Sequence, residues 1–176
     1  NEEVFKNIRE LLVDYGILLN NDFVVDKISY VNGSNGLIPL IKKLSKESII
    51  TKSISGQIFF PLVSSIESSE GKIKGSVDIL AQSSAFPASW AEKNLQEMLT
   101  KKITYNDGFD VKGPNTVALA WDELSSDKSH TQIVVVGNGS FLQNHYQKFT
   151  DNFSFFMGSI AWLTGEDQLQ SFTDIV

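Results

Sequence analysis

The sequence predicts an α/β domain in which helices flank a mixed, mostly parallel β-sheet. Ile133–Val136 is a continuous β-branched run, which is typical of a strand buried on both faces, as in a parallel sheet. Glycines at 137 and 139 end this strand, and Ser140 is placed to cap a short helix. A longer helix follows and ends at Gly165. Its apolar residues, spaced for one buried helix face, are Phe153, Phe156, Met157, Ile160 and Leu163.

Two further apolar runs predict the neighbours of this strand. Val77–Gln82 and Thr116–Trp121 are the other long strand patterns of the chain. Because consecutive β-α-β units place their strands side by side, we expect Ile133–Val136 between these two.

The remaining elements are shorter. Asn1–Tyr15 has the pattern of an amphipathic helix, and Gln57–Val63 that of a strand that ends or lies at an edge at Pro61. Leu37–Leu44 fits either a helix with a proline in its first turn or an extended segment. Ser89 and Glu92 have the spacing of a capping box, so a short helix is expected over Leu95–Leu99.

Composition restricts the possible functions. The 176 residues predict a single domain over 1–176, and no run approaches the ~20 apolar residues that a membrane helix needs. The chain has no cysteine, which excludes disulfides and thiolate sites. The net charge is −6 and Arg9 is the single arginine, so we expect no nucleic-acid partner.

Few residues are candidates for chemistry. Ser140, at a strand–turn–helix junction, is a possible nucleophile with His145 or His130 as its base, although the G-x-S-x-G pattern of hydrolases is absent. A capping role for Ser140 and surface positions for both histidines are the simpler interpretation. Exposed together, Trp90, Trp121 and Trp162 would form a platform for a sugar, whereas separate tryptophans usually lie in a core. We therefore expect no catalytic residue, metal or cofactor, and regard Ser140, His145 and Trp90 as weak ligand candidates.

Short phrases along the whole chain resemble one known family. The C-terminal matches are Val135, Val136, Gly137, Phe141, Asn152, Phe155, Phe156, Trp162, Leu163, Gly165 and Glu166. The earlier matches are Tyr15–Ile17, Asp22, Asp26, Ile50, Thr51, Gly56, Gln57, Phe60, Pro61, Ser65, Glu67, Ser89, Trp90, Glu92 and Lys112–Pro114. In this order they resemble the gliding-motility-type ABC transporter auxiliary family.

The resemblance implies a fold similar to the class I amidotransferase-like, Rossmann-like fold, lacking its first strands, with Leu37–Leu44 extended. It implies a non-enzymatic, extracytoplasmic component on the periplasmic face, membrane-anchored in the full-length protein, whose partners are an ABC permease and ATPase. The chain would then be a fragment of a longer protein, and we expect it to self-associate through an open sheet edge or through its first helix. The family offers no catalytic or ligand residue to carry over.

Three hypotheses remain open, because a fold alone does not fix a function. The favoured one is an interaction domain of an ABC transport complex. The others are a small-ligand or glycan-binding module, and a hydrolase using Ser140.

Overall fold

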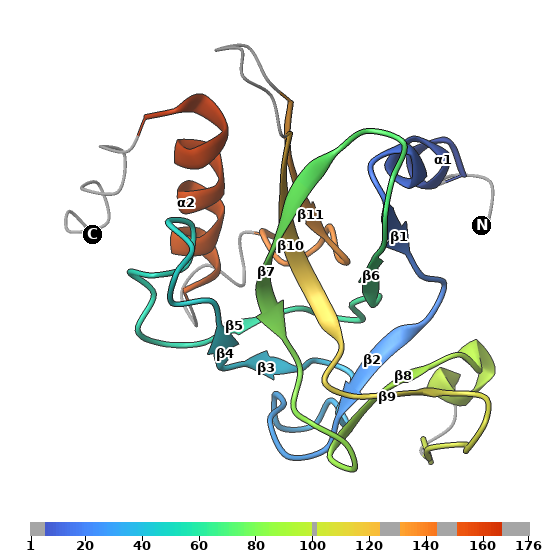
Figure 1. Ribbon diagram of the computed structural model, residues 1–176. Helices are drawn as coiled ribbons and strands as arrows, with labels where there is room; N and C mark the ends of the chain where they lie inside the picture. The colour runs from blue at the N-terminus through green and yellow to red at the C-terminus, as the bar shows by residue number, and fades with distance from the viewer. Residues whose placement is uncertain (1–5, 100–101, 124–130, 144–150, 167–176) are drawn as a thin grey trace.

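The centre of the computed structural model is a four-stranded sheet in the order β11–β10–β7–β4 (Figure 1). The structure describes residues 6–99, 102–123, 131–143 and 151–166. In the order of the sheet, these strands span Gln132–Val136, Thr116–Glu123, Gly75–Gln82 and Lys43–Leu44. All three neighbouring pairs are antiparallel, and β10, not β11, is buried between two long partners.

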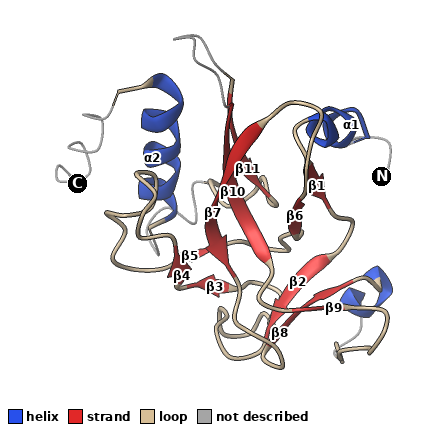
Figure 2. Cartoon of the chain, in the orientation of Figure 1, coloured by secondary structure: helices blue, strands red, loops and turns tan. Residues whose placement is uncertain are grey.

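The predicted mostly parallel, Rossmann-like sheet is therefore wrong. Every strand pair in the described chain is antiparallel, and strands and loops predominate over the two α-helices (Figure 2). Ile133–Val136 does share a sheet with Val77–Gln82 and Thr116–Trp121, but it forms an edge of that sheet instead of its centre. The reason is that a β-branched run indicates burial on both faces and carries no information on strand direction.

Two layers cover the faces of this sheet (Figure 1). Helix α2, Asn152–Thr164, packs on one face, where Ala118 and Ala120 of β10 lie in the same core as Phe155. The other face carries helix α1, Lys6–Asp14, together with the two-stranded sheet of β1, Ile17–Leu19, and β6, Ile66–Ser68. The core on that side contains Leu12, Ile17, Ile66, Leu119, Trp121 and Val135.

A second, three-stranded sheet forms a lobe at one end of the molecule. Its order is β2–β8–β9, with bounds Phe23–Asp26, Ser89–Glu92 and Val111–Lys112. The capping-box role predicted for Ser89 and Glu92 is thus wrong, because all four residues of β8 are buried in a strand that pairs on both sides. A 3₁₀ helix, η1, Leu95–Leu99, follows where the helix was expected.

The extended alternative for Leu37–Leu44 is confirmed. β3, Leu40–Ile41, pairs with β5, Ile58–Phe59, and β4 continues into the central sheet. The strand expected over Gln57–Val63 ends before Pro61, as the missing amide donor of proline requires.

Both helices bury faces that differ from the predicted ones. In α1, Leu12 is buried whereas Ile8 and Leu11 are exposed, and the first five residues of the expected helix lie outside the described chain. In α2 the buried residues are Asn152, Phe155, Gly158, Ser159 and Ala161. The predicted core set is wrong, since Phe153 and Leu163 are exposed and Phe156, Met157 and Ile160 are half-buried.

Candidate functional site

Ser140 lies in the turn after β11, not at the start of a helix. Its backbone N–H donates to Asn138 Oδ1 at 3.0 Å, and Asn138 Nδ2 donates to Ser140 Oγ at 3.2 Å. The two residues that follow it form a turn. His145 and His130, the candidate bases, lie outside the described residues. The visible contacts of Ser140 therefore serve to shape a local turn, as serine and asparagine side chains commonly do.

The three tryptophans do not form a common exposed platform. Trp90 is 4% exposed and its Nε1 donates to Glu92 Oε2 at 3.1 Å. Trp121 is buried under α1 and stacks edge-on against Tyr15, with ring centroids 4.9 Å apart. Trp162 is half-buried against the α2 core. Two of the three rings are buried, so the tryptophans offer no common surface on which a sugar could stack.

Two buried carboxyl groups tie the small lobe together. Glu92 accepts from the indole of Trp90 and from the backbone of Asn94, the latter at 2.9 Å. Asp110 accepts from the backbone of Lys93 and of Asn106, at 3.1 and 2.7 Å. Burial is the main cause that raises the pKa of Glu92 above its usual 4.5, and the neighbouring Asp110 adds to it. These groups lie inside the lobe and hold its loops, so they offer no acid to a substrate.

Asp22 and Ser65 form a second buried polar pair, between β2 and β6. Ser65 donates to Asp22 twice, from Oγ at 2.6 Å and from its backbone N–H at 2.8 Å. Burial raises the pKa of Asp22 above its usual 3.8. Asn20 Nδ2 in turn donates to Ser65 Oγ at 2.9 Å and to Glu67 Oε1 at 3.0 Å. This chain of contacts fixes the start of β6 and holds Glu67 at the surface.

Several residues of the family resemblance have structural roles of this kind. Trp90, Glu92 and Asn152 are buried and hydrogen-bonded. Gly137 passes so close to the carbonyl of Ser64 that a Cβ has no room there. At Gly113 a Cβ would lie 2.6 Å from the carbonyl oxygen of Ser84. These residues of the family resemblance therefore lie at positions where the fold itself restricts the residue type.

A helix stripe that the sequence analysis placed in the core is instead the main apolar surface of α2. We call the set Phe153, Phe156, Met157, Ile160 and Leu163 the α2 stripe. Phe153 is 44% exposed and Leu163 is 40% exposed, while the opposite side of the helix is buried against the sheet. Apolar side chains on both sides of one helix normally indicate that both sides are covered.

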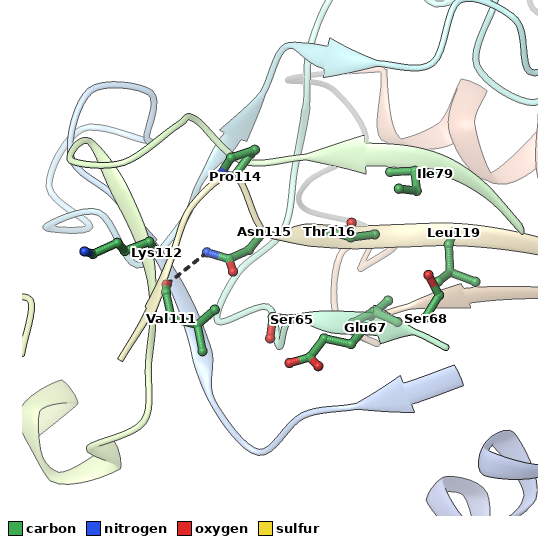
Figure 3. A pocket seen from close by; sticks show the side chains of 11 residues that line it. Ser65, Glu67, Ser68, Ile79, Val111, Lys112, Pro114, Asn115, Thr116 and Leu119 are labelled. Atoms are coloured by element: carbon green, nitrogen blue, oxygen red, sulfur yellow. Dashed lines mark hydrogen bonds between the residues drawn. The ribbon is translucent and has the colours of Figure 1, made fainter. Parts of the chain in front are cut away.

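A groove on the opposite face of the sheet is the second candidate surface. It encloses about 290 Å³ between β6 and β7, and we call it the β6 groove. Figure 3 shows Leu119 and Thr116 of β10 lying between Ile79 of β7 and the side chains of β6. At its closed end, the Asn115 side chain is 3.5 Å from the carbonyl oxygen of Val111. No sequence pattern predicts this groove, because it depends on where the three-residue strand β6 ends above the larger sheet.

A further hollow, of about 310 Å³, lies between β4 and the loop after β7. Its lining includes Ser83, Ser84 and the exposed Lys42 and Lys43. The backbone N–H of Ser84 donates to the buried carboxylate of Asp26. Among the described residues, no three metal-ligating side chains come together. No helix in the described ranges has the length and apolar character to cross a bilayer.

Comparisons with known proteins establish the fold only. No protein-family model matches the chain, and no curated protein matches it. Among solved structures, the chain is similar to the mmIFT52 N-terminal domain, with a TM-score of 0.60. The two are 17% identical, and the match covers 93% of this chain and 60% of that one.

The chain shares its fold with that domain. It spans three fifths of the length of that structure, and at this identity the likeness carries no information on function. The family resemblance found in the sequence stays a prediction.

Proposed function

We propose that this chain is a non-catalytic protein-interaction domain of an ABC-type transport system. In this proposal it lies on the extracytoplasmic side, belongs to a longer membrane-anchored protein, and contacts the permease or another subunit through the α2 stripe. The observation that carries the proposal is the surface of α2, because the protein's own core covers only one side of a helix that is apolar on both.

The geometry of the stripe fits a protein partner. From Phe153 to Leu163 it extends over ten helical positions, or about 15 Å at 1.5 Å per residue. Side chains at successive turns of one helix face are the usual anchors of helix-in-groove recognition. Full burial of an exposed phenylalanine or leucine contributes about 1.5–3 kcal/mol. Phe153 and Leu163 are 44% and 40% exposed, so covering each of them would contribute somewhat less than half of that to a complex.

The two alternatives lack comparable support. The tryptophan platform on which the glycan-binding alternative depends is not formed, because Trp90 and Trp121 are buried. A serine hydrolase would need a base directed at Ser140, whereas the contacts described for Ser140 Oγ are with Asn138. The resemblance to the auxiliary family and the α2 stripe point in the same direction, which is why we favour an interaction domain.

Co-purification tests the proposal. The full-length protein that the proposal predicts is coexpressed with the permease and ATPase of the same system and isolated in mild detergent. We expect Phe153→Ser combined with Leu163→Ser to reduce the recovered permease at least about tenfold, while the domain stays folded because both side chains are exposed. The matched control is Ile28→Ser, an exposed apolar residue elsewhere, which should change nothing. Unchanged recovery with the α2 variant, or no association of the unaltered protein, would refute the proposal.

A further inference from the structure

We propose that the open edge of β6 binds an extended segment of a partner protein, in which apolar residues flank a central Lys or Arg. The segment would add a third strand to the β1–β6 sheet and lie in the β6 groove. This inference uses a different face of the domain from the α2 stripe and does not depend on the proposed function.

The hydrogen-bonding pattern of β6 leaves one of its edges available for a further strand. β6 pairs with β1 alone among the described strands, and the register places Leu18 opposite Glu67. Ser69 N–H donates to the Gly16 carbonyl at 2.8 Å, and Asn20 N–H donates to the Ser65 carbonyl at 3.0 Å. Odd-numbered residues of this segment thus turn their backbone groups toward β1.

The alternate residues, Ile66 and Ser68, consequently turn their N–H and C=O groups away from β1, as antiparallel pairing requires. Both residues line the β6 groove. A strand edge of this kind is a template for one more strand.

Exposed apolar side chains of β7 lie beside this edge. Helix α1 and the β1–β6 sheet together bury Leu119 and Trp121 of β10. Val77 and Ile79, which pair with Trp121 and Leu119 across the β7 ladder, are nevertheless 37% and 42% exposed. A strand paired with β6 would lie about 4.8 Å beyond it, on the β7 side. Residues paired with Ile66 and Ser68 would point in the same direction as those side chains, toward the sheet. Apolar side chains at these two positions would therefore cover Ile79 (Figure 3).

The charge of Glu67 determines which residue type fits between these two positions of the added strand. Glu67 points away from the sheet because its neighbours in β6 point toward it. Its Oε1 accepts from Asn20 at 3.0 Å, and it forms no ion pair within the described part of the chain. A residue directly opposite on an added strand would have its Cβ about 4.5–5.5 Å away, where an opposite charge stabilises and a like charge destabilises. The partner segment therefore carries Lys or Arg at this position.

The same charge argues against a second copy of this chain. Antiparallel pairing of two β6 strands about a two-fold axis would bring their central Glu67 residues face to face. The net charge of −6 adds to the repulsion between copies. A basic segment of another protein meets neither obstacle.

Synthetic peptides test the inference on the 176-residue chain. The probe is a fluorescein-labelled peptide with the core Thr-Val-Lys-Val-Thr, titrated in fluorescence anisotropy and in amide NMR spectra. Three companions carry glutamate for the lysine, N-methyl groups on both valines, or one N-methyl group on the lysine. The valine amides face β6 and the lysine amide faces solvent in the predicted pairing.

We expect the lysine peptide to bind and to shift the amide signals of Ile66 and Ser68. N-methylation of the valines should weaken binding at least about tenfold through the loss of two hydrogen bonds, and N-methylation of the lysine should leave it unchanged. The glutamate peptide should bind about two- to fivefold more weakly, and Glu67→Lys should reverse that preference. Ile79→Ser, an exposed position, should weaken both peptides without unfolding the domain.

Other results overturn the inference. These are absence of binding at millimolar peptide, binding that tolerates N-methylated valines, and amide shifts confined to another face. A dimer in sedimentation that Ser68→Pro abolishes, with no peptide bound, would assign the edge to a second copy and equally overturn it. Ser68→Ala, which keeps the backbone N–H, is the matched control for that variant.

Discussion

The side chain of Asn152 is hydrogen-bonded to both backbone groups of Phe59, a residue 93 positions earlier in the chain. Phe59 N–H donates to Asn152 Oδ1 at 3.0 Å, and Asn152 Nδ2 donates back to the Phe59 carbonyl at 3.0 Å. Asn152 Nδ2 also donates to the carbonyl of Phe141 at 2.9 Å. One buried amide thus ties the first residue of α2 to β5 and to the turn after β11.

Asn152→Ala should lower the free energy of unfolding by about 3 kcal/mol or more, since it leaves a buried N–H and two carbonyls without this partner and each such loss costs about 1–3 kcal/mol. Urea denaturation measures the change. The neighbouring Ser154→Ala is the control and should stay within about 0.5 kcal/mol. Equal midpoints for both variants would show that the amide does not hold these elements together.

Two adjacent phenylalanines in α2 should respond very differently to truncation. Phe155 is buried between the rings of Phe60 and Phe141, each with its centroid 6.1 Å away, so Phe155→Ala should cost about 3–5 kcal/mol. Phe156 is half-buried on the α2 stripe, and Phe156→Ala should cost less than about 1.5 kcal/mol. Thermal melts of the two variants compare them directly. The reverse order would restore the helix face predicted from sequence.

That prediction was wrong for a physical reason. Residues Asn152–Thr164 are apolar on nearly every side, so spacing alone does not define a buried face. Ser159, which is buried, donates to the carbonyl of Phe155 at 2.9 Å within the helix, and a small residue is what close packing on the sheet requires. Sequence periodicity predicts that the face with the most large apolar side chains is buried. In the structure the buried face instead includes Gly158, Ser159 and Ala161.

The positions of the helices and main strands along the chain could be predicted from the sequence better than their arrangement in space. Gly165, predicted to end α2, adopts a left-handed conformation there with φ of 67°, and the runs at Val77–Gln82 and Thr116–Trp121 are strands. The capping-box prediction for Ser89 and Glu92 was wrong because the spacing of the box is a local pattern, whereas the pairing of β8 with β2 and β9 is not local. The β6 groove and the α2 stripe are products of tertiary packing, which a single sequence does not encode in any local pattern.

The buried acid of the small lobe should make stability depend on pH. An unfolded Glu92 loses its proton near its usual pKa of 4.5, whereas the folded one, with a raised pKa, keeps it to higher pH. The folded state then binds more protons, so the free energy of unfolding falls as pH rises from about 4.5 through the raised pKa. The raised pKa of Asp22 acts in the same direction from its usual 3.8.

Glu92→Gln should therefore flatten this decline. Urea unfolding at intervals between pH 4 and pH 8 gives the free energy at each point, and the variant is expected to lose less stability across the range than the unaltered chain. Glu70→Gln, at a side chain that is 94% exposed, controls for the loss of one charge. A slope shared by all three proteins would mean that Glu92 ionises in the folded state as it does in the unfolded one.

A substitution at Gly158, in the middle of α2, distinguishes the effect of helix propensity on stability from that of packing. Propensity alone predicts that Gly158→Ala stabilises a helix by about 1 kcal/mol. In the structure, however, a Cβ at this position would lie 2.6 Å from the backbone carbonyl oxygen of the buried Ile50. Overpacking of that kind costs about 1–3 kcal/mol, and a backbone oxygen cannot rotate away as a side chain can.

We therefore expect Gly158→Ala to lower the melting temperature, with a net loss of about 1–2 kcal/mol in the free energy of unfolding. Gly139→Ala is the matched control, because a Cβ there meets no atom within 4 Å and the backbone does not have a positive φ, so its stability should stay close to that of the unaltered chain. Stabilisation by Gly158→Ala would show that α2 stands further from the Ile50 loop than described. The buried side of α2 would then be less tightly packed than the structure shows. The difference between this buried side and the exposed α2 stripe would be smaller, and the proposed interaction surface depends on that difference.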